Sequence, residues 1–133
     1  MYTVTKQVFF CYGHRLMNYD GKCRHPHGHN GKLEVTIEKD SLDRLGMVMD
    51  FEDIKATVQK WVDGELDHKM LLNAKDPLAQ VLRDLGEPVV TMDGNPTAEN
   101  IAQLVFDTAR GMKLPVASVR LWETVNSYAE HRG

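Results

Sequence analysis

The chain has 133 residues, of which 42% are hydrophobic and 26% charged, and it contains five proline and ten glycine residues. This profile excludes disorder and collagen and is typical of one ordinary soluble domain. The net charge of -3 and the pI near 6.0 argue against a general binder of nucleic acids or anionic membranes, because either function needs a basic face.

The two cysteines and the amino-terminal segment give further expectations. Cys11 and Cys23 are too few for a disulfide framework, so both are expected to be free thiols. Cys11 lies in an apolar run and is expected in the core. Residues 1–10 lack an apolar run of secretory length, and no stretch approaches the roughly 20 apolar residues of a membrane span. We expect a cytoplasmic protein with one domain over residues 1–133 and no membrane association.

The first strands are predicted from composition and alternation. Residues 2–12 are rich in Thr, Val, Phe and Tyr, which favour a strand. Residues 32–38 alternate, with Leu33, Val35 and Ile37 on one face and polar side chains on the other. The alternation predicts a half-buried, antiparallel pairing of these two strands.

Two long amphipathic helices are predicted further along the chain. Residues 51–62 carry apolar side chains at helical spacing, and Asp50 stands at the N-cap position. The other long helix is capped by Thr97 and continues to Met112. Both helices are expected to contribute an apolar face to the core.

A shorter helix is predicted between the two long ones. It starts at Asp76-Pro77, a cap followed by proline at the first helical position, and it stops at Gly86. Its apolar side chains are expected to face the core: Leu78, Val81, Leu82 and Leu85.

The last predicted strands cover residues 116–123 and the vicinity of Tyr128. Period two places Glu123 in line with Val119 and Leu121. Two interpretations of Glu123 stay open: a strand-end carboxylate that reaches water, or a buried acceptor for the N–H groups of a ligand. The order of elements predicts an α+β fold, with an antiparallel β-sheet, two main helices packed on one face and a short extra helix.

Histidines concentrate in one segment, where His25, His27 and His29 lie within five residues. In extended backbone these imidazoles share one face. Two of them and His14, at the end of the first strand, could form a zinc site with an open fourth position. Such a site favours catalysis, because structural zinc usually has four protein ligands. Spacing alone does not select the ligands, and a solvated turn that binds no metal is the alternative.

Two further segments are candidates for proton transfer. Asp67 and His68 are adjacent in a loop, where the pair could hold a general base or form an ordinary surface turn. Cys23 lies four residues before a candidate ligand. It could be a base whose thiolate is stabilised by a nearby Zn²⁺ and by Lys22 and Arg24, or a small packed residue.

These segments, in their order along the chain, resemble the 6-pyruvoyl-tetrahydropterin synthase and 6-carboxytetrahydropterin synthase family. The resemblance spans nearly the whole chain, and the Cys-to-His and His-to-His intervals also match. The matching motifs are His14-Arg15-Leu16, Cys23-xxx-His27-Gly28-His29-Asn30, Gly46-Met47-Val48-Met49-Asp50-Phe51, Leu66-Asp67-His68, Leu72-Asn73, Pro96-Thr97-Ala98-Glu99-Asn100 and Glu123-Thr124.

The resemblance implies a zinc site and a catalytic base. His14, His27 and His29 match the zinc ligands of the family, which leaves His25 out. Cys23 matches the cysteine that takes a proton from the substrate side chain. The resemblance also implies the tunnelling fold, which assembles through its sheets, commonly as a hexamer, with sites at subunit boundaries.

The remaining site residues are also implied by the resemblance. Asp67 and His68 match the partners of the cysteine in proton relay. Glu123 matches the residue that binds the guanidine-like edge of the pterin and is linked to the relay, and Thr97 matches the rim of that pocket. The candidates for binding the triphosphate are Lys22, Arg15 and Arg24.

The function implied is that of a zinc-dependent lyase. It would convert 7,8-dihydroneopterin triphosphate to 6-carboxy-5,6,7,8-tetrahydropterin and release acetaldehyde and triphosphate, in the biosynthesis of queuosine-type deazapurines. One alternative is a 6-pyruvoyl-tetrahydropterin synthase, which eliminates only triphosphate. Another is a zinc-stabilised assembly module that has lost its activity.

The sequence also departs from the family pattern. Cys11-Tyr12-Gly13 stand where relatives commonly have small residues, and Gly31 stands where an aromatic residue often follows His-Gly-His-Asn. Residues 74–95 form a longer connection than many members carry. These changes lie around the expected pocket, so they bear on the substrate more than on the fold.

Overall fold

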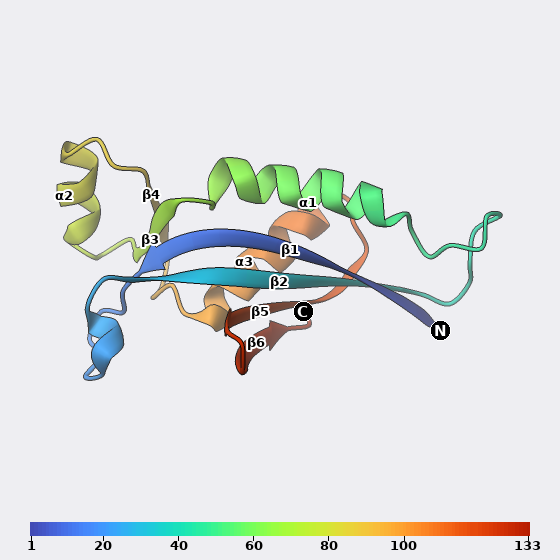
Figure 1. Cartoon of the computed structure of the whole chain (residues 1–133), viewed down its shortest axis with the longest axis horizontal. Helices are drawn as coiled ribbons and strands as arrows, with labels where there is room; N and C mark the ends of the chain where they lie inside the picture. Colours follow the sequence, from blue (N-terminus) through green and yellow to red (C-terminus); the bar gives the residue numbers. More distant parts are fainter.

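Two long strands, β1 (Tyr2–His14) and β2 (His27–Lys39), form the centre of the computed structural model, which describes residues 1–133 (Figure 1). They pair antiparallel in an unbroken register from Tyr2↔Lys39 to His14↔His27. A 3₁₀ turn at Lys22–Arg24 lies in the connection between them. Both strands are longer than the sequence predicted, and the added residues place histidines on regular strand positions.

The carboxyl-terminal strands extend this sheet as predicted. Strand β5 (Val116–Thr124) pairs antiparallel with β2, and β6 (Ser127–His131) pairs antiparallel with β5. Val119 and Leu121 are buried. Glu123 therefore follows two core positions on the same face of β5, as the alternation predicted.

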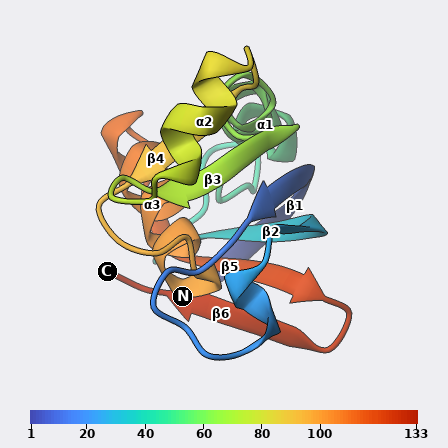
Figure 2. The ribbon, with the colours of Figure 1, turned by 90° about the vertical axis from the view of Figure 1, so that its left-hand side faces the viewer.

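Two short strands that the sequence did not predict complete the sheet. Strand β3 (Lys69–Asn73) pairs parallel with β1, and β4 (Val89–Met92) pairs parallel with β3. The sheet is therefore mixed, with six strands in the order β4-β3-β1-β2-β5-β6. A run such as Lys69–Asn73 has no polar alternation, so its sequence does not separate a strand from a helix segment. Figure 2 shows β3 and β4 at one end of the sheet and β5 and β6 at the other.

The two long helices cover the same face of the sheet, as expected. Helix α1 (Phe51–Glu65) packs on β1, and α3 (Ala98–Gly111) packs on β5 and β6. Their buried residues join those of the strands in one hydrophobic core. Asp50 caps α1 by accepting from the N–H of Glu52 at 2.9 Å, and Thr97 caps α3. None of the helices combines the length and apolar content that a membrane crossing requires.

The prediction for the short helix was right in position and half right in orientation, because Leu78 and Leu82 are half-buried whereas the other two predicted core residues are exposed. Helix α2 (Leu78–Asp84) crosses from β3 to β4, and its buried residue is Ala79. Val81 is 52% exposed and Leu85 is 71% exposed. The helix lies at the edge of the sheet and ends at Asp84, so it has too few turns to bury an apolar stripe.

The expectation that Cys11 belongs to the core was also wrong, because its side chain is exposed. Successive strand residues point to opposite faces, and the neighbours Phe10 and Tyr12 are buried. Cys11 therefore shares the outer face of β1 with Phe9, which is also exposed. An apolar run within a strand of a half-covered sheet fills both faces, so apolar neighbours did not indicate burial.

Candidate metal centre

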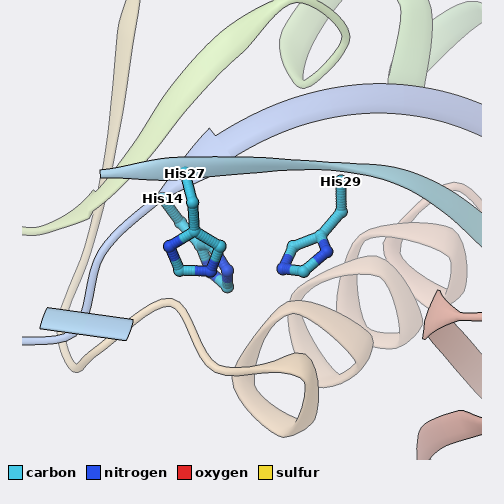
Figure 3. Close-up of side chains that lie close together, drawn as sticks. All are labelled: His14, His27 and His29. Carbon is cyan, nitrogen blue, oxygen red and sulfur yellow. The ribbon is translucent and has the colours of Figure 1, made fainter. Parts of the chain in front are cut away.

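Three histidines converge where β1 ends and β2 begins. His14 closes β1, directly opposite His27 in the ladder, and His29 follows two residues later on the same face of β2. Their ring centroids lie 4.5 to 5.0 Å apart, and one nitrogen from each ring lies within 4.8 Å of the other two. Figure 3 shows the imidazoles turned toward a common space. His25 precedes Pro26 and lies outside this cluster.

The unused nitrogens of these rings are what a metal site requires. The Nε2 atoms of His14, His27 and His29 are all buried and lack a hydrogen-bond partner. Buried polar atoms are almost always paired in proteins, so three unpaired nitrogens at one point indicate a missing ligand. The cluster includes no cysteine or carboxylate. Three imidazoles with an open position fit the donor set of a catalytic zinc site.

The other ring nitrogens orient these rings. Nδ1 of His14 donates to the carbonyl oxygen of Pro96 at 2.7 Å, and Nδ1 of His27 donates to that of His25 at 2.8 Å. Bonds of this kind fix the tautomer that leaves Nε2 free for a metal. Burial lowers the pKa of His14 to about 4, which keeps this imidazole neutral, the form that binds metal.

Glu123 lies beside this cluster. Its Oε2 is 3.2 Å from Nε2 of His29, and its side chain is mostly buried. The register between β5 and β6 shifts between Trp122 and Thr124, so Glu123 lies in an irregularity of the kind that redirects side chains near functional sites. Burial raises the pKa of Glu123. Glu123 is therefore a mostly buried carboxylate beside the cluster, and not one that simply points into water.

Asp67 and His68 form a hydrogen-bonded pair on the outer side of the sheet. Nδ1 of His68 donates to Oδ2 of Asp67 at 2.7 Å, and Oδ1 of Asp67 accepts from the N–H of Cys11 at 2.9 Å. His68 adopts a positive φ of 59° and lines a cavity of about 500 Å³ together with Cys11, Met70 and His27. Its side chain is 78% exposed. The chain thus orients this dyad without placing it in the histidine cluster.

Cys23 and Thr97 lie on the segments that border the cluster. Cys23 is half-buried on the 3₁₀ turn between β1 and β2, and its carbonyl accepts from the N–H of Leu16 at 2.8 Å. Its thiol makes no hydrogen bond within the chain and is not part of the histidine cluster. The hydroxyl of Thr97 accepts from the N–H of Asn100 at 3.1 Å, directly after the Pro96 carbonyl that holds His14.

The three basic candidates for triphosphate binding differ in availability. Arg15 is committed to Asp76, with Nε donating to Oδ2 at 2.7 Å, and this bond holds the pKa of the Asp76 carboxyl below its usual range. Arg24 donates to the carbonyl of Asp20 at 3.0 Å. Lys22 is exposed and forms no ion pair within the chain. Lys22 is therefore the one of the three cations whose charged group makes no hydrogen bond or ion pair within the chain.

Two features of the site were not predicted as functional from the sequence. The Pro96 carbonyl that orients His14 is a backbone group, which no side-chain pattern reveals. Tyr12 is almost fully buried, and its hydroxyl is the fourth unpartnered atom of this region. Burial, followed by the charge of Glu123, raises the pKa of its phenol. The available signal was its position two residues before His14, on the same face of the strand.

Similarity to known proteins supports one family for this chain. Residues 3–133 match the model of the family described as 6-pyruvoyl tetrahydropterin synthase. Proteins named 6-carboxy-5,6,7,8-tetrahydropterin synthase are similar throughout: that of Rickettsia felis is 35% identical, over 98% of this chain and 99% of that protein. That of Haemophilus influenzae is 33% identical, over 99% of both.

Solved structures show the same fold. An uncharacterized protein from Wolinella succinogenes has a TM-score of 0.83 and 28% identity, over 99% of this chain and 98% of that one. The 6-pyruvoyl tetrahydropterin synthase of Caenorhabditis elegans has a TM-score of 0.75 and 24% identity, over 99% of this chain and 95% of that one. The tunnelling fold expected from the resemblance is confirmed. Family model, relatives and fold agree, and the chain belongs to the 6-pyruvoyl tetrahydropterin synthase family.

Proposed function

We propose that the protein is a zinc-dependent lyase that converts 7,8-dihydroneopterin triphosphate to 6-carboxy-5,6,7,8-tetrahydropterin. The reaction releases acetaldehyde and triphosphate and balances with the uptake of one water. The observation that carries the proposal is the cluster of His14, His27 and His29 with Glu123 beside it, in a chain of this family. An all-histidine site with room for a substrate group suits catalysis better than structure.

Each proposed residue has a chemical task that suits its position. Zn²⁺ held by three neutral imidazoles would supply uncompensated positive charge, which makes the hydroxyls and adjacent C–H groups of a bound side chain more acidic. Cys23, on the turn that borders the cluster, takes a proton from the substrate side chain. Glu123 accepts two N–H bonds from the aminopyrimidine edge of the pterin, as a carboxylate does from arginine. Thr97 forms the rim of this pocket.

Asp67 and His68 complete the proton relay from a neighbouring subunit. The exposure of His68 on the outer side of the sheet supports this arrangement, because a relay group needs a substrate within hydrogen-bond reach. We propose a homo-oligomer, a hexamer as the family resemblance implies, in which the dyad of one chain faces the histidine cluster of the next. Lys22, as the free cation, binds the triphosphate.

The relatives favour the carboxy product over the pyruvoyl product. The similar proteins named 6-carboxy-5,6,7,8-tetrahydropterin synthase reach 35% and 36% identity, and the 6-pyruvoyl tetrahydrobiopterin synthase of Pongo abelii is 30% identical. We therefore assign the protein to the cytoplasmic synthesis of queuosine-type deazapurines.

Product analysis tests this assignment. Zinc-loaded protein is incubated with 7,8-dihydroneopterin triphosphate, and every product is identified by mass spectrometry. We expect 6-carboxytetrahydropterin, acetaldehyde and triphosphate in equal amounts. A pterin that keeps all three side-chain carbons would instead identify a 6-pyruvoyl-tetrahydropterin synthase, and recovery of unchanged substrate would identify an inactive assembly module.

A further inference from the structure

Tyr12 is a polar residue of the site that has no role in the proposed function. Its side chain is almost fully buried, yet its hydroxyl has no hydrogen-bond partner. Tyr12 pairs with His29 in the β1–β2 ladder, and its ring centroid lies 5.7 Å from that of His29 and 5.2 Å from that of His14. Leaving a buried donor unpaired is unfavourable, so a structural role alone does not explain this hydroxyl.

The Tyr12 ring lies across β2 because Gly31 has no side chain there. A Cβ on Gly31 would be 3.0 Å from Cε1 of Tyr12 and 2.9 Å from Cε1 of Phe10, closer than side chains normally approach. The Tyr12 ring stacks on Phe10 with centroids 4.9 Å apart and so fills the place of a side chain at position 31. The β2–β5 ladder, continued by one residue, places Gly31 opposite Glu123. Tyr12 thus spans from β1 toward Glu123 on β5.

Glu123 has no hydrogen-bond donor among the histidines of the cluster. Its neighbour in the structure is Nε2 of His29, 3.2 Å away. That nitrogen is also the atom free to bind a metal, and a nitrogen bound to a metal carries no proton to donate. The Tyr12 ring covers Gly31, the residue of β2 that lies opposite Glu123. The Tyr12 hydroxyl is therefore the buried donor that remains for this carboxylate.

We propose that Tyr12 is a positioning residue for Glu123, whose hydroxyl donates a hydrogen bond to the carboxylate and fixes its plane toward the bound pterin. Each carboxylate oxygen has two lone pairs, so one bond from Tyr12 leaves both oxygens able to accept N–H groups. A donor held by packing orients its partner better than a mobile side chain does. This inference rests on the proposed function, which assigns Glu123 to pterin binding.

The test removes the hydroxyl and keeps the ring. Tyr12→Phe retains the stacking on Phe10, and Tyr2→Phe, on an exposed position of the same strand, is the matched control. Binding of 7,8-dihydroneopterin to zinc-loaded protein is measured by fluorescence titration, together with KM, kcat and the Tm of the ligand-free protein. We expect Tyr12→Phe to raise Kd and KM about tenfold, the usual effect of losing a hydrogen bond to a charged group, with kcat within about twofold.

The Tm separates positioning from structural support. Because the hydroxyl is unpartnered in the free chain, its removal should leave the Tm unchanged or raise it. A lower Tm with unchanged Kd would make Tyr12 a structural residue and overturn the inference. Equal Kd values for Tyr12→Phe and wild type would also overturn it, and wild-type turnover would show that the proposed function still stands.

A second variant tests whether Tyr12 acts through Glu123. In a Glu123→Gln background the effect of Tyr12→Phe should shrink to less than about threefold, because a hydrogen bond to a neutral amide is about half as strong as one to a carboxylate. An undiminished tenfold effect would overturn the link to Glu123. A wild-type protein that neither binds nor converts the pterin would instead remove the proposed function, and this inference with it.

Discussion

The two faces of strand β1 hold two candidate catalytic groups in opposite states. On the inner face, His14 is buried, its Nδ1 is bonded to the Pro96 carbonyl, and its Nε2 points at two further imidazoles. On the outer side, His68 is 78% exposed and is held by a hydrogen bond from its Nδ1 to Asp67. The His14 side chain is thus buried by its own chain, whereas the His68 side chain is held in one orientation and stays exposed to solvent.

This difference shows how much of the site one chain can build. Strand register alone brings the inner histidines together, so their convergence is a property of the fold. The Asp67–His68 dyad has a fixed geometry: it is bonded to the Cys11 backbone of β1, and the N–H of Asp67 donates to the carbonyl of Val62 in α1. A proton-transfer group must face its substrate within hydrogen-bond distance. The role proposed for the dyad therefore requires a second surface, whereas the histidine cluster is assembled within one chain.

Removing one ligand of the inner site has the largest expected effect. His27→Ala deletes one of three imidazoles at a partly exposed position, so the core stays filled. We expect the zinc content, measured by plasma emission spectrometry, to fall from one per chain to background. Turnover of dihydroneopterin triphosphate should fall at least about a thousandfold.

His25→Ala is the control and should keep both the zinc content and the turnover, because His25 lies outside the cluster. A zinc-replete, active His27→Ala protein would contradict the site.

Cys23→Ala tests the proposed proton transfer without changing the three histidines of the cluster. The thiol lies on the 3₁₀ turn and is no part of the histidine cluster, so zinc content and Tm should persist. Loss of a general base lowers turnover by about a hundredfold to ten-thousandfold. Cys11→Ala, the other free thiol, is the control and should change turnover less than about twofold, since its contacts to the dyad are made by its backbone. Unchanged lyase activity in Cys23→Ala would remove Cys23 from the mechanism.

Most of the fold and the inner cluster were predictable, because both follow from local periodicity. Alternation located β2 and β5, helical spacing located α1 and α3, and the same parity rule puts His27 and His29 on one face. The resemblance, rather than spacing, set His25 aside. The choice has a local cause in the structure, since Pro26 separates His25 from β2.

What the sequence did not predict depends on tertiary partners. Strands β3 and β4 are short apolar runs that become strands through pairing, β3 along β1 and β4 along β3. The exposure of Cys11 depends on which face of β1 the helices leave uncovered. The role inferred for Tyr12 depends on Gly31, which lies 19 positions further along the chain. Contacts between residues so far apart in the chain are set by strand register and side-chain packing. A short stretch of sequence carries no information about either.

Subunit mixing tests whether the outer dyad serves another chain. His68→Ala and Cys23→Ala are each expected to lose about a hundredfold or more in turnover. If each site combines Cys23 of one chain with His68 of its neighbour, co-expression of the two variants should restore about a quarter of wild-type activity, since about a quarter of randomly assembled sites are intact.

A matched mixture shows that the recovery is specific. His68→Ala combined with Asp67→Asn damages the dyad in every chain, so co-expression should restore nothing. The same absence of recovery in the first mixture would mean that Asp67 and His68 act within their own chain. That result would break the contrast between an inner cluster built by one chain and an outer dyad that serves another.

The smallest expected effect concerns the pH dependence of the inner site in metal-free protein. The pKa of His14 lies near 4 in the folded chain against 6.5 for an ordinary histidine. Between these values the unfolded state binds more protons, so the free energy of unfolding falls as the pH drops. The change in the free energy of unfolding amounts to about 2 kcal/mol from about pH 7.5 to about pH 5.

Urea titrations at both pH values measure this change, and His14→Gln should show a shallower dependence on pH. Burial raises the pKa of Glu123 above the ordinary 4.5, so this carboxyl adds stability as the pH drops through its folded-state pKa, opposite in sign to His14. An identical slope in wild type and His14→Gln would mean that His14 is not held neutral by burial, and the inner face would lose the preorganisation that distinguishes it from the outer one.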